Sequence, residues 1–297
     1  MTGTGVVIVT YQCRELALAC LQSLADHIPA VLPNTVVVDN ASTDGTVAAV
    51  QTRWPEMRVI QRAANDGFAT GVNDGIAALA ECDVVCLLNP DALVCDDGIA
   101  RAAAFLREHA NVGVLGGRIV NRDGTVQASA RQFPGFRTAL FNRHSLTTKF
   151  APRNRFSREY LMSEWTHLDA RPVDWVSGAF MFIHRRTVEP VGMLDAGYFF
   201  GIEDVDYCRR VWDAGLEVWY FPDAIVQHRI GGSSRSAVYR AMAGHHRGMW
   251  RYYRAHLRAN RALDVAVVAG IGGRLGLHAA SYALRTAKNR VLRRPNP

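Results

Sequence analysis

The feature that most constrains the fold is an apolar run, Cys82 to Leu88, that ends abruptly in Asn89-Pro90-Asp91. A short apolar run bounded by turn residues is typical of a strand buried on both faces of a sheet. Pro90 has no backbone N–H to donate, so we expect the strand to end there. Asp91 then follows the carboxyl end of a central strand, where ligands bind in open α/β sheets. Its carboxylate can hold a divalent cation, or it can simply hydrogen-bond the backbone of its own turn.

Strands alternate with helices along the first third of the chain. Apolar periodicity predicts strands at 6–9, 35–39, 57–61 and 84–88, and helices at 13–27, up to about 53, and 71–80. This alternation predicts a parallel, doubly wound sheet. Polar residues follow three of these strands and are expected on one edge of the sheet: Thr10-Tyr11, Asp39-Asn40 and Asn89-Pro90-Asp91. No G-x-G-x-x-G motif opens a helix, which argues against a dinucleotide-binding protein.

The remaining elements are less regular in sequence. We expect a helix up to about 109, extended residues at 112–120, and an irregular acceptor-side region at 121–170. A strand is predicted at 173–183, a short helix at 185–191, a helix up to 214, and short strands at 216–220 and 224–226.

Two further positions are candidates for chemistry. Glu203-Asp204 opens a predicted helix after an aromatic loop. Acidic residues at this position commonly only cap the helix, but a carboxylate can also take the proton of an attacking hydroxyl group. Asp206 is expected to be structural or to contact an acceptor. His228 follows a predicted strand, and its imidazole can be a structural group or a ligand for a manganese-like ion.

The charge of the chain is unevenly distributed. The net charge is +7, but residues 235–297 contain 13 Lys and Arg against one acid, Asp264, which leaves +12 there and −5 in the rest. Residues 238–260 are predicted to form a basic amphipathic helix, and the apolar stretch 262–273 is too short to span a membrane. We therefore expect a domain at 1–234 and a basic helical appendage at 235–297 that favours an anionic membrane surface.

The N-terminus and the cysteines favour a cytoplasmic protein. Met1 is followed almost at once by a predicted strand, with no basic segment or long apolar segment of a signal peptide. The six cysteines have no zinc-site spacing, and we expect them to be reduced.

Several motifs occur in an order that resembles glycosyltransferase family 2, in its bacterial rhamnosyltransferase-like branch. The resemblance covers about residues 5–232 and rests on Thr10-Tyr11, Asp39 to Gly45, Asn65 to Phe68, Asn89 to Asp91, Trp175 to Ala179 and Phe199 to Asp206. It implies a GT-A fold, a Rossmann-like doubly wound mixed sheet, and an inverting transfer from a nucleotide sugar.

The resemblance also implies roles for individual residues. Asp204 is expected to be the catalytic base, and Asp91 and His228 to hold Mn²⁺ or Mg²⁺. The expected donor-binding residues are Thr10, Tyr11, Asp39, Asn40, Asn65, Gly67, Asn73 and Asn89. The expected acceptor- or sugar-binding residues are Trp175, Ser177, Gly178, Ala179 and Glu203. Asn89 departs from the family, in which many members have Asp, and this departure weakens the expected metal motif.

The segment Asp123 to Gln132 resembles the same branch and favours dTDP-L-rhamnose as the donor. The acceptor is expected to be a lipid-linked or cell-envelope glycan at the inner face of the cell membrane. Three alternatives remain: a UDP-sugar donor, a non-catalytic nucleotide-sugar or polyanion-binding scaffold, and a nucleic-acid binder acting through the tail. The last is disfavoured because no nucleic-acid motif accompanies the tail. The sequence does not indicate an oligomeric state.

Overall fold

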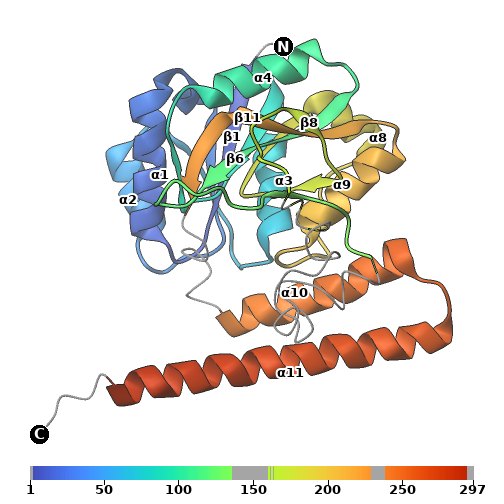
Figure 1. Cartoon of the computed structure of the whole chain (residues 1–297). Helices are drawn as coiled ribbons and strands as arrows, with labels where there is room; N and C mark the ends of the chain where they lie inside the picture. Colours follow the sequence, from blue (N-terminus) through green and yellow to red (C-terminus); the bar gives the residue numbers. More distant parts are fainter. Residues whose placement is uncertain (1–2, 136–159, 161, 163, 229–237, 293–297) are drawn as a thin grey trace, which may run out of the picture.

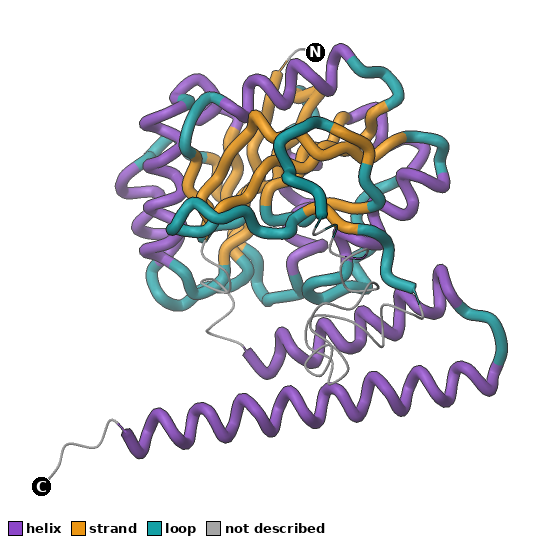
Figure 2. Tube along the Cα trace, viewed as in Figure 1, coloured by secondary structure: helices purple, strands orange, loops and turns teal. Residues whose placement is uncertain are grey.

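The computed structural model describes residues 3–135, 160, 162, 164–228 and 238–292. A large sheet lies at its centre with helices on both faces, and two C-terminal helices lie below this body in Figure 1. Figure 2 shows that the strands are confined to the body, whereas the C-terminal part is helical. All six cysteines lie within the described residues and are free thiols.

The first four long strands are parallel, as the alternation predicts. In the sheet they lie in the order β3 (Arg58–Gln61), β2 (Thr35–Asp39), β1 (Gly3–Thr10) and β4 (Cys82–Leu88). The connecting helices are α1 (Arg14–His27), η1 (Pro29–Asn34), α2 (Thr46–Arg53) and α3 (Phe68–Ala78). Each predicted helix and strand in this region is confirmed to within a few residues at its ends.

The following elements widen the sheet and add a small second one. They are β5 (Ala92–Val94), α4 (Gly98–Glu108), β6 (Val112–Val120), β7 (Ala130–Arg131), β8 (Arg171–Pro172), β9 (Trp175–Val176), β10 (Phe180–His184), η2 (Arg185–Thr187), α8 (Val188–Val191), α9 (Glu203–Asp213) and β11 (Glu217–His228). The main order is β3-β2-β1-β4-β10-β6-β11-β5, with β8 beside β11, and β7 pairs with β9 in the second sheet.

The sheet is mixed, not parallel throughout. Strand β10 is antiparallel to both of its neighbours, β4 and β6, while β6 and β11 are parallel. A parallel neighbour of β4 would need a crossover that returns the chain to the opposite end of the sheet. Strand β10 instead begins beside the carboxyl end of β4, where Phe180 pairs with Leu88. The mixed sheet implied by the resemblance is confirmed, and the parallel sheet predicted from alternation is wrong beyond β4.

Two strand predictions need correction. The single strand predicted at 173–183 is interrupted at 177–179, so that β9 joins the small sheet and β10 joins the large one. The two strands predicted at 216–220 and 224–226 are one continuous strand, β11, whose pairing with β6 shifts between Phe221 and Ile225. Pro222 lies at this shift, where its missing N–H removes no regular ladder bond.

The core lies on both faces of the sheet, and β1 shows why. Val6 and Ile8 pack into the cluster that α1, α2 and α4 cover, whereas Val7 and Val9 pack into the cluster under α3 and α9. Successive side chains of a strand point to opposite faces, so a strand covered on both sides must be apolar at every position.

The C-terminal helices differ from the prediction. The helix predicted at 238–260 is α10 (Val238–Tyr252) followed by a π-helical turn, η4 (Tyr253–Leu257). The apolar stretch is part of a much longer helix, α11 (Arg261–Leu292), in which Arg261–Leu284 is long and apolar enough to cross a membrane. The prediction of too short an apolar segment is therefore wrong. Most of the irregular region predicted at 121–170 lies outside the described residues.

Candidate active site

A turn at residues 177–179 brings the two candidate carboxylates to the same place. Asn89 N donates to the carbonyl of Ala179 at 3.0 Å, which holds the turn against the end of β4. On the other side, Gly178 N donates to Asp204 Oδ2 at 3.1 Å. Ser177 closes the turn, since its Oγ accepts from Ala179 N at 3.3 Å. Asp91 and Asp204 thus lie on either side of one short turn, at the carboxyl end of β4.

Asp91 and His228 are in direct contact. The distance from His228 Nε2 to Asp91 Oδ1 is 3.1 Å, and the two side chains are 11% and 1% exposed. This contact follows from the sheet, because β5 pairs with β11 and Ala92 lies opposite His228. Asp91 immediately precedes Ala92, so the turn after β4 places its carboxylate beside the imidazole.

Gln127 fixes the orientation of the His228 ring. Its amide nitrogen donates to the His228 carbonyl at 2.7 Å and to Asn121 Oδ1 at 2.9 Å, so its Oε1 is the atom that faces His228 Nδ1 at 3.1 Å. Oε1 can only accept, and Nδ1 must therefore carry the proton. Nε2 faces the Asp91 carboxylate at 3.1 Å, where a protonated Nε2 donates to Oδ1 and an unprotonated Nε2 presents its lone pair.

Asp91 and His228 could together hold a divalent cation. Neutral imidazole and carboxylate both bind Mn²⁺ or Mg²⁺, so His228 Nε2 and Asp91 Oδ1 are candidate ligands. The described residues contain no group of three or more His, Cys, Asp or Glu that could hold a metal ion. A cation here would need further ligands from a bound diphosphate, as is usual for Mg²⁺ at phosphate sites.

Asp204 and Glu203 begin α9 but face different surroundings. Glu203 is buried, and its Oε2 accepts from Ile202 N at 2.9 Å. Asp204 is only partly buried, and its Oδ1 accepts from Val205 N at 2.9 Å. Burial raises the pKa of both carboxyl groups, and the charge of Asp204 further raises that of Glu203. Asp204 is the member of the pair that a bound acceptor can reach.

Arg131 lies near the candidate base. Its guanidinium is stacked over the Trp175 ring, 5.2 Å from the ring centroid, and its Nε donates to the Ala128 carbonyl at 2.8 Å. Its positive charge lowers the pKa of Asp204 and partly opposes the effect of burial. Trp175 itself is buried in β9, and its indole N–H donates to the Gln132 carbonyl at 2.8 Å. Trp175 therefore supports Arg131, and Arg131 faces the site.

The candidate donor residues after β1 and β2 form one network. Thr10 Oγ1 donates to Asp39 Oδ2 at 2.9 Å, and Ser42 N donates to Asp39 Oδ1 at 2.7 Å. Thr10 and Asp39 are both completely buried, whereas Tyr11 is half-buried. Gln12 has a positive φ of 50°, which is uncommon for a residue other than glycine. Asp39 thus holds Thr10 and the turn after β2 in place through these hydrogen bonds, and Tyr11 is the group that is accessible to a ligand.

The other candidate donor residues hold loops against each other. Asn40 Nδ2 donates to the Gly67 carbonyl at 3.1 Å, and Asn65 Oδ1 accepts from Gly67 N at 3.1 Å. Gly67 has φ +101°, and a Cβ there would lie 2.5 Å from the Phe199 carbonyl oxygen. Asn73 on α3 donates to and accepts from the backbone of Leu194, at 2.8 and 3.0 Å. The structure does not bring the Asn73 amide to the edge with the others, because both of its polar atoms are engaged there.

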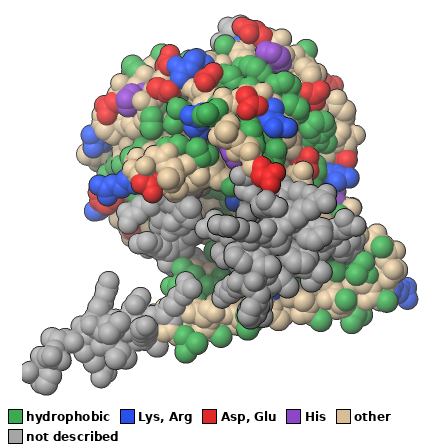
Figure 3. All heavy atoms as spheres, in the orientation of Figure 1, with side chains coloured by type: hydrophobic (Ala, Val, Ile, Leu, Met, Phe, Trp, Pro, Cys, Tyr) green, Lys and Arg blue, Asp and Glu red, His purple; other side chains and the backbone are tan. Residues whose placement is uncertain are grey.

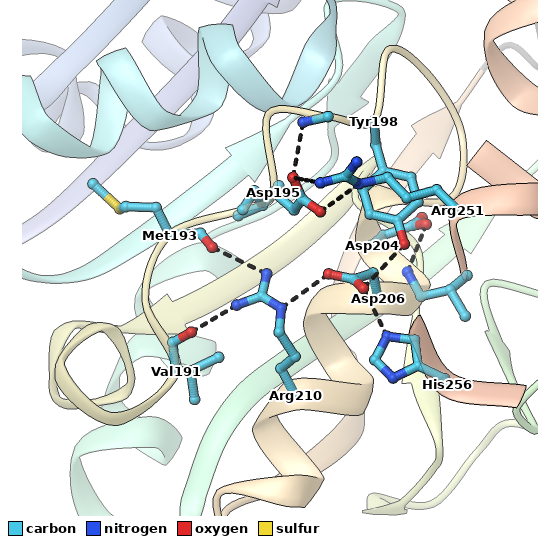
Figure 4. A network of polar contacts seen from close by, with 12 residues as sticks. Val191, Met193, Asp195, Tyr198, Asp204, Asp206, Arg210, Arg251 and His256 are labelled. Atoms are coloured by element: carbon cyan, nitrogen blue, oxygen red, sulfur yellow. Dashed lines mark hydrogen bonds and ion pairs between the residues drawn. The ribbon is translucent and has the colours of Figure 1, made fainter. Parts of the chain in front are cut away.

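Asp206 is a structural residue, one of the two roles expected for it. It is buried and accepts from Tyr198 Oη at 3.1 Å, Arg210 Nε at 2.9 Å and His256 Nε2 at 2.7 Å, as Figure 4 shows. Burial alone would raise the pKa of Asp206, but the hydrogen bonds from His256 and Arg210 hold it below its usual range. Since His256 belongs to η4, this carboxylate joins α9 to the C-terminal helices.

Four residues near the site carry no role in the sequence analysis: Gln12, Gln127, Arg131 and Arg240. Gln127 and Arg131 lie within a segment noticed only for its resemblance to a family branch. Arg240 is on α10, and its guanidinium donates to the Asn65 carbonyl at 2.7 Å. No sequence signal could identify this contact, because it joins residues 175 positions apart.

The chain is similar in sequence to known proteins. A model of the family described as Glycosyltransferase like family 2 matches residues 2–255, and therefore extends through α10 into η4. The N-acetylglucosaminyl-diphospho-decaprenol L-rhamnosyltransferase of Mycobacterium tuberculosis is 34% identical over 270 residues, which cover 83% of this chain and 86% of that protein.

Solved structures share the fold at low sequence identity. GalNAc-T7 with UDP, GalNAc and Mn²⁺ has a TM-score of 0.58 at 16% identity, over 77% of this chain and 44% of that one. The mannosyltransferase PcManGT of Pyrobaculum calidifontis, solved with GDP-Man and Mn²⁺, has a TM-score of 0.55 at 16% identity, over 98% and 81%. The mixed sheet and its helices are therefore an α/β GT-A fold.

Proposed function

The chain belongs to glycosyltransferase family 2, and we propose that it transfers L-rhamnose from dTDP-L-rhamnose to a hydroxyl group of a lipid-linked glycan. The observation that supports this donor and acceptor is the 34% identity to an L-rhamnosyltransferase over most of both chains. The proposed place of action is the inner face of the cell membrane, in the synthesis of cell-envelope glycan.

In the proposed mechanism Asp204 takes the proton from the acceptor hydroxyl as its oxygen attacks the anomeric carbon. The dTDP leaving group departs from the opposite face, so that a single displacement inverts the configuration at this carbon. Asp204 can act as this base because burial raises its pKa, which strengthens the carboxylate as a proton acceptor. No covalent intermediate with the protein is needed.

Asp91 and His228 are proposed to hold Mn²⁺ or Mg²⁺, with Gln127 keeping the His228 ring in the orientation that directs Nε2 to the ion. When bound, the cation offsets the negative charge that develops on the diphosphate leaving group. Tyr11, Asp39 and the 65–67 loop are proposed to form the nucleoside pocket. Asn89, where a second carboxylate is common in the family, contributes its backbone to the 177–179 turn.

A donor screen tests this proposal. Thermal shift with dTDP-L-rhamnose, UDP-sugars and GDP-mannose, each with and without Mn²⁺, should show the largest stabilisation for dTDP-L-rhamnose with the metal. In the Asp91→Ala variant, Mn²⁺ should no longer add to the stabilisation by dTDP-L-rhamnose. A larger thermal shift with a UDP-sugar would indicate that the donor is this UDP-sugar and not dTDP-L-rhamnose. Binding without transfer of the sugar to a lipid-linked acceptor would favour a non-catalytic scaffold.

A further inference from the structure

Basic side chains of the two C-terminal helices gather beside the loop that leads into Asp204. His245 and His246 belong to α10, and Arg274 and His278 belong to α11. The His245 ring donates from Nδ1 to the carbonyl of Gly201 at 3.1 Å. The His246 ring lies 5.7 Å from that of His245 and 5.5 Å from that of His278, between ring centroids. This group, called the tail cluster below, therefore contacts the active-site loop through His245.

Two polar atoms of the tail cluster are buried without a partner. Arg274 Nε and His246 Nε2 are inaccessible to solvent and make no hydrogen bond within the described part of the chain. No ion pair joins Arg274 to a described carboxylate. A guanidinium whose Nε is buried without a partner among the described residues favours a bound phosphate group, which would offset its charge and accept its hydrogen bonds.

Tyr160 and Arg131 connect the tail cluster with the base. The Tyr160 hydroxyl accepts a hydrogen bond from Arg131, and its pKa is raised by burial but lowered by the positive charges of Arg131 and Arg274. The negative charge of Asp204 also acts on Tyr160. The charges of Arg131, Arg274 and Asp204, the carboxylate proposed to activate the acceptor, thus all act on one tyrosine.

The opposite side of α11 is apolar. Between residues 265 and 284 the single Asp, Glu, Lys or Arg is Arg274, which is partly buried. The large hydrophobic side chains Val265, Val268, Leu277 and Leu284 are 52–72% exposed. Figure 3 shows hydrophobic and neutral side chains along α11 on the drawn face. One helix therefore presents a cation toward the active site and an apolar surface away from it.

We propose that Arg274, together with His278 and Arg131, binds the diphosphate group of a prenyl-linked acceptor, while the apolar side of α11 lies in the bilayer surface. This inference rests on the proposed function, because it assigns a binding site for its acceptor. A sugar linked through diphosphate to a lipid must present its hydroxyl to Asp204 while its chain stays in the membrane. The base, the cationic site and the apolar helix match the hydroxyl group, the diphosphate and the lipid chain of such an acceptor, respectively.

Direct binding tests the site without sugar transfer. Farnesyl diphosphate, farnesol and inorganic pyrophosphate are titrated calorimetrically into the full chain in the presence of EDTA. We expect farnesyl diphosphate to bind at least tenfold more tightly than either of the others, since both the diphosphate and the chain contribute. Equal affinity for farnesol would overturn the diphosphate site, and equal affinity for pyrophosphate would overturn its lipid source.

Variants locate the site. Arg274→Gln should weaken farnesyl diphosphate binding about tenfold or more, because it removes a charge-assisted hydrogen bond to the diphosphate. Arg274→Lys should retain part of the affinity. Arg247→Gln removes the same charge from an exposed position on α10 and should bind as the wild type does. Asp91→Ala should also leave the affinity for farnesyl diphosphate unchanged, which separates this site from the donor site.

Unchanged binding by a folded Arg274→Gln variant would overturn the proposal. If that variant does not fold, two other measurements test the proposal. They are the affinity of His278→Asn for farnesyl diphosphate, and the wild-type preference for farnesyl diphosphate over farnesol. Transfer assays separate this inference from the proposed function: Arg274→Gln should raise the KM for a prenyl diphosphate-linked N-acetylglucosamine but not for octyl N-acetylglucosaminide. Diphosphate binding through Arg274 without any rhamnose transfer would contradict the proposed function alone.

Discussion

At the scale of single residues, Asp204 and Asp206 show how one helix turn gives two carboxylates opposite properties. Asp204 accepts backbone N–H groups and is affected by burial, which raises its pKa. Asp206 is also buried, but His256 and Arg210 stabilise its ionised form. The first carboxylate is therefore a stronger base, and the second stays ionised and structural.

The first prediction concerns Asp204. Asp204→Asn should lower kcat by roughly 10²-fold or more while donor affinity is nearly unchanged, because Asn cannot accept the proton. The control is Asp213→Asn, an exposed position at the end of the same helix. Turnover is measured with dTDP-L-rhamnose, and donor affinity by thermal shift. Near-wild-type turnover of Asp204→Asn would exclude it as the base.

The same carboxylate predicts a pH dependence. Only ionised Asp204 can act as a base, and its pKa is raised above the ordinary value of 3.8, so kcat/KM should fall with decreasing pH at a higher pH than for an exposed aspartate. The folded state binds this proton more tightly than the unfolded state. Ionisation therefore costs stability as pH rises from the unfolded to the folded pKa, and Asp204→Asn should not reduce stability at neutral pH.

The second prediction concerns Gln127, which hydrogen-bonds His228. Gln127→Ala removes the acceptor of the His228 Nδ1 proton and should lower Mn²⁺ affinity 10–100-fold, as is typical for residues that orient a metal ligand. Mn²⁺ binding in the presence of dTDP is measured directly, and Gln51→Ala, at an exposed position of α2, serves as the control. Unchanged Mn²⁺ affinity would show that Gln127 does not orient the ligand.

At the scale of elements, α10 is part of the active-site wall as well as the start of the appendage. A Cβ on Gly244 would lie 2.7 Å from the Phe199 ring, so the glycine allows α10 to approach the loop before Asp204. Arg251 pairs with Asp195 at 2.6 Å, and Tyr252 and Tyr253 are buried. Tyr252 and Tyr253 thus pack within the protein and are not available to a membrane surface. The division at 234/235 remains a proposal.

The third prediction tests how α9 and η4 are joined. Asp206→Asn should lower the free energy of unfolding by about 3 kcal/mol, because it leaves a buried ionic network incomplete. Asp213→Asn breaks only the exposed i,i+4 pair with Arg209, whose members are 36% and 55% exposed, and should cost less than about 0.5 kcal/mol. Urea unfolding compares the two. Equal losses would mean that burial adds nothing to the Asp206 network.

At the scale of the whole molecule, charge and apolarity lie on different parts of the tail. Residues 235–297 carry 13 Lys and Arg and one acid, yet the exposed side of α11 between 265 and 284 has no described acidic or basic side chain. An anionic bilayer can attract the basic positions and also receive the apolar side. Peripheral attachment through α11 is therefore our proposal, although Arg261–Leu284 has the length and composition of a spanning helix.

The fourth prediction tests this attachment in the full chain. The wild type should sediment with anionic lipid vesicles, and less so at high salt, since each basic residue near the surface contributes ~1 kcal/mol. A Val268→Glu and Leu277→Glu double variant should remain in the supernatant. Leu168→Glu, at a 66% exposed position of the body, should sediment like the wild type. Salt-insensitive sedimentation of all three proteins would contradict a role of α11 in attachment.

The sequence alone determined the first four strands, their helices and the edge where Asp39 and Asp91 lie. These elements depend on local periodicity and on turn residues such as Pro90, which act within a few positions of the chain. The ordered motifs also indicated the family and the mixed GT-A sheet, because they preserve residues in a fixed order. Asp91 and His228 were proposed together only through this resemblance, since 137 positions separate them.

Only the tertiary structure decided which polar groups face one another. Asp91 meets His228 because β5 pairs with β11, and Asp204 meets the 177–179 turn because β10 lies beside β4. The roles of Gln127 and Arg131, the buried network of Asp206, and the inward position of Arg274 follow from such long-range contacts. Local sequence cannot specify them, because the type of a charged residue does not say whether its side chain is exposed or buried. Its surroundings come from segments far apart in the chain.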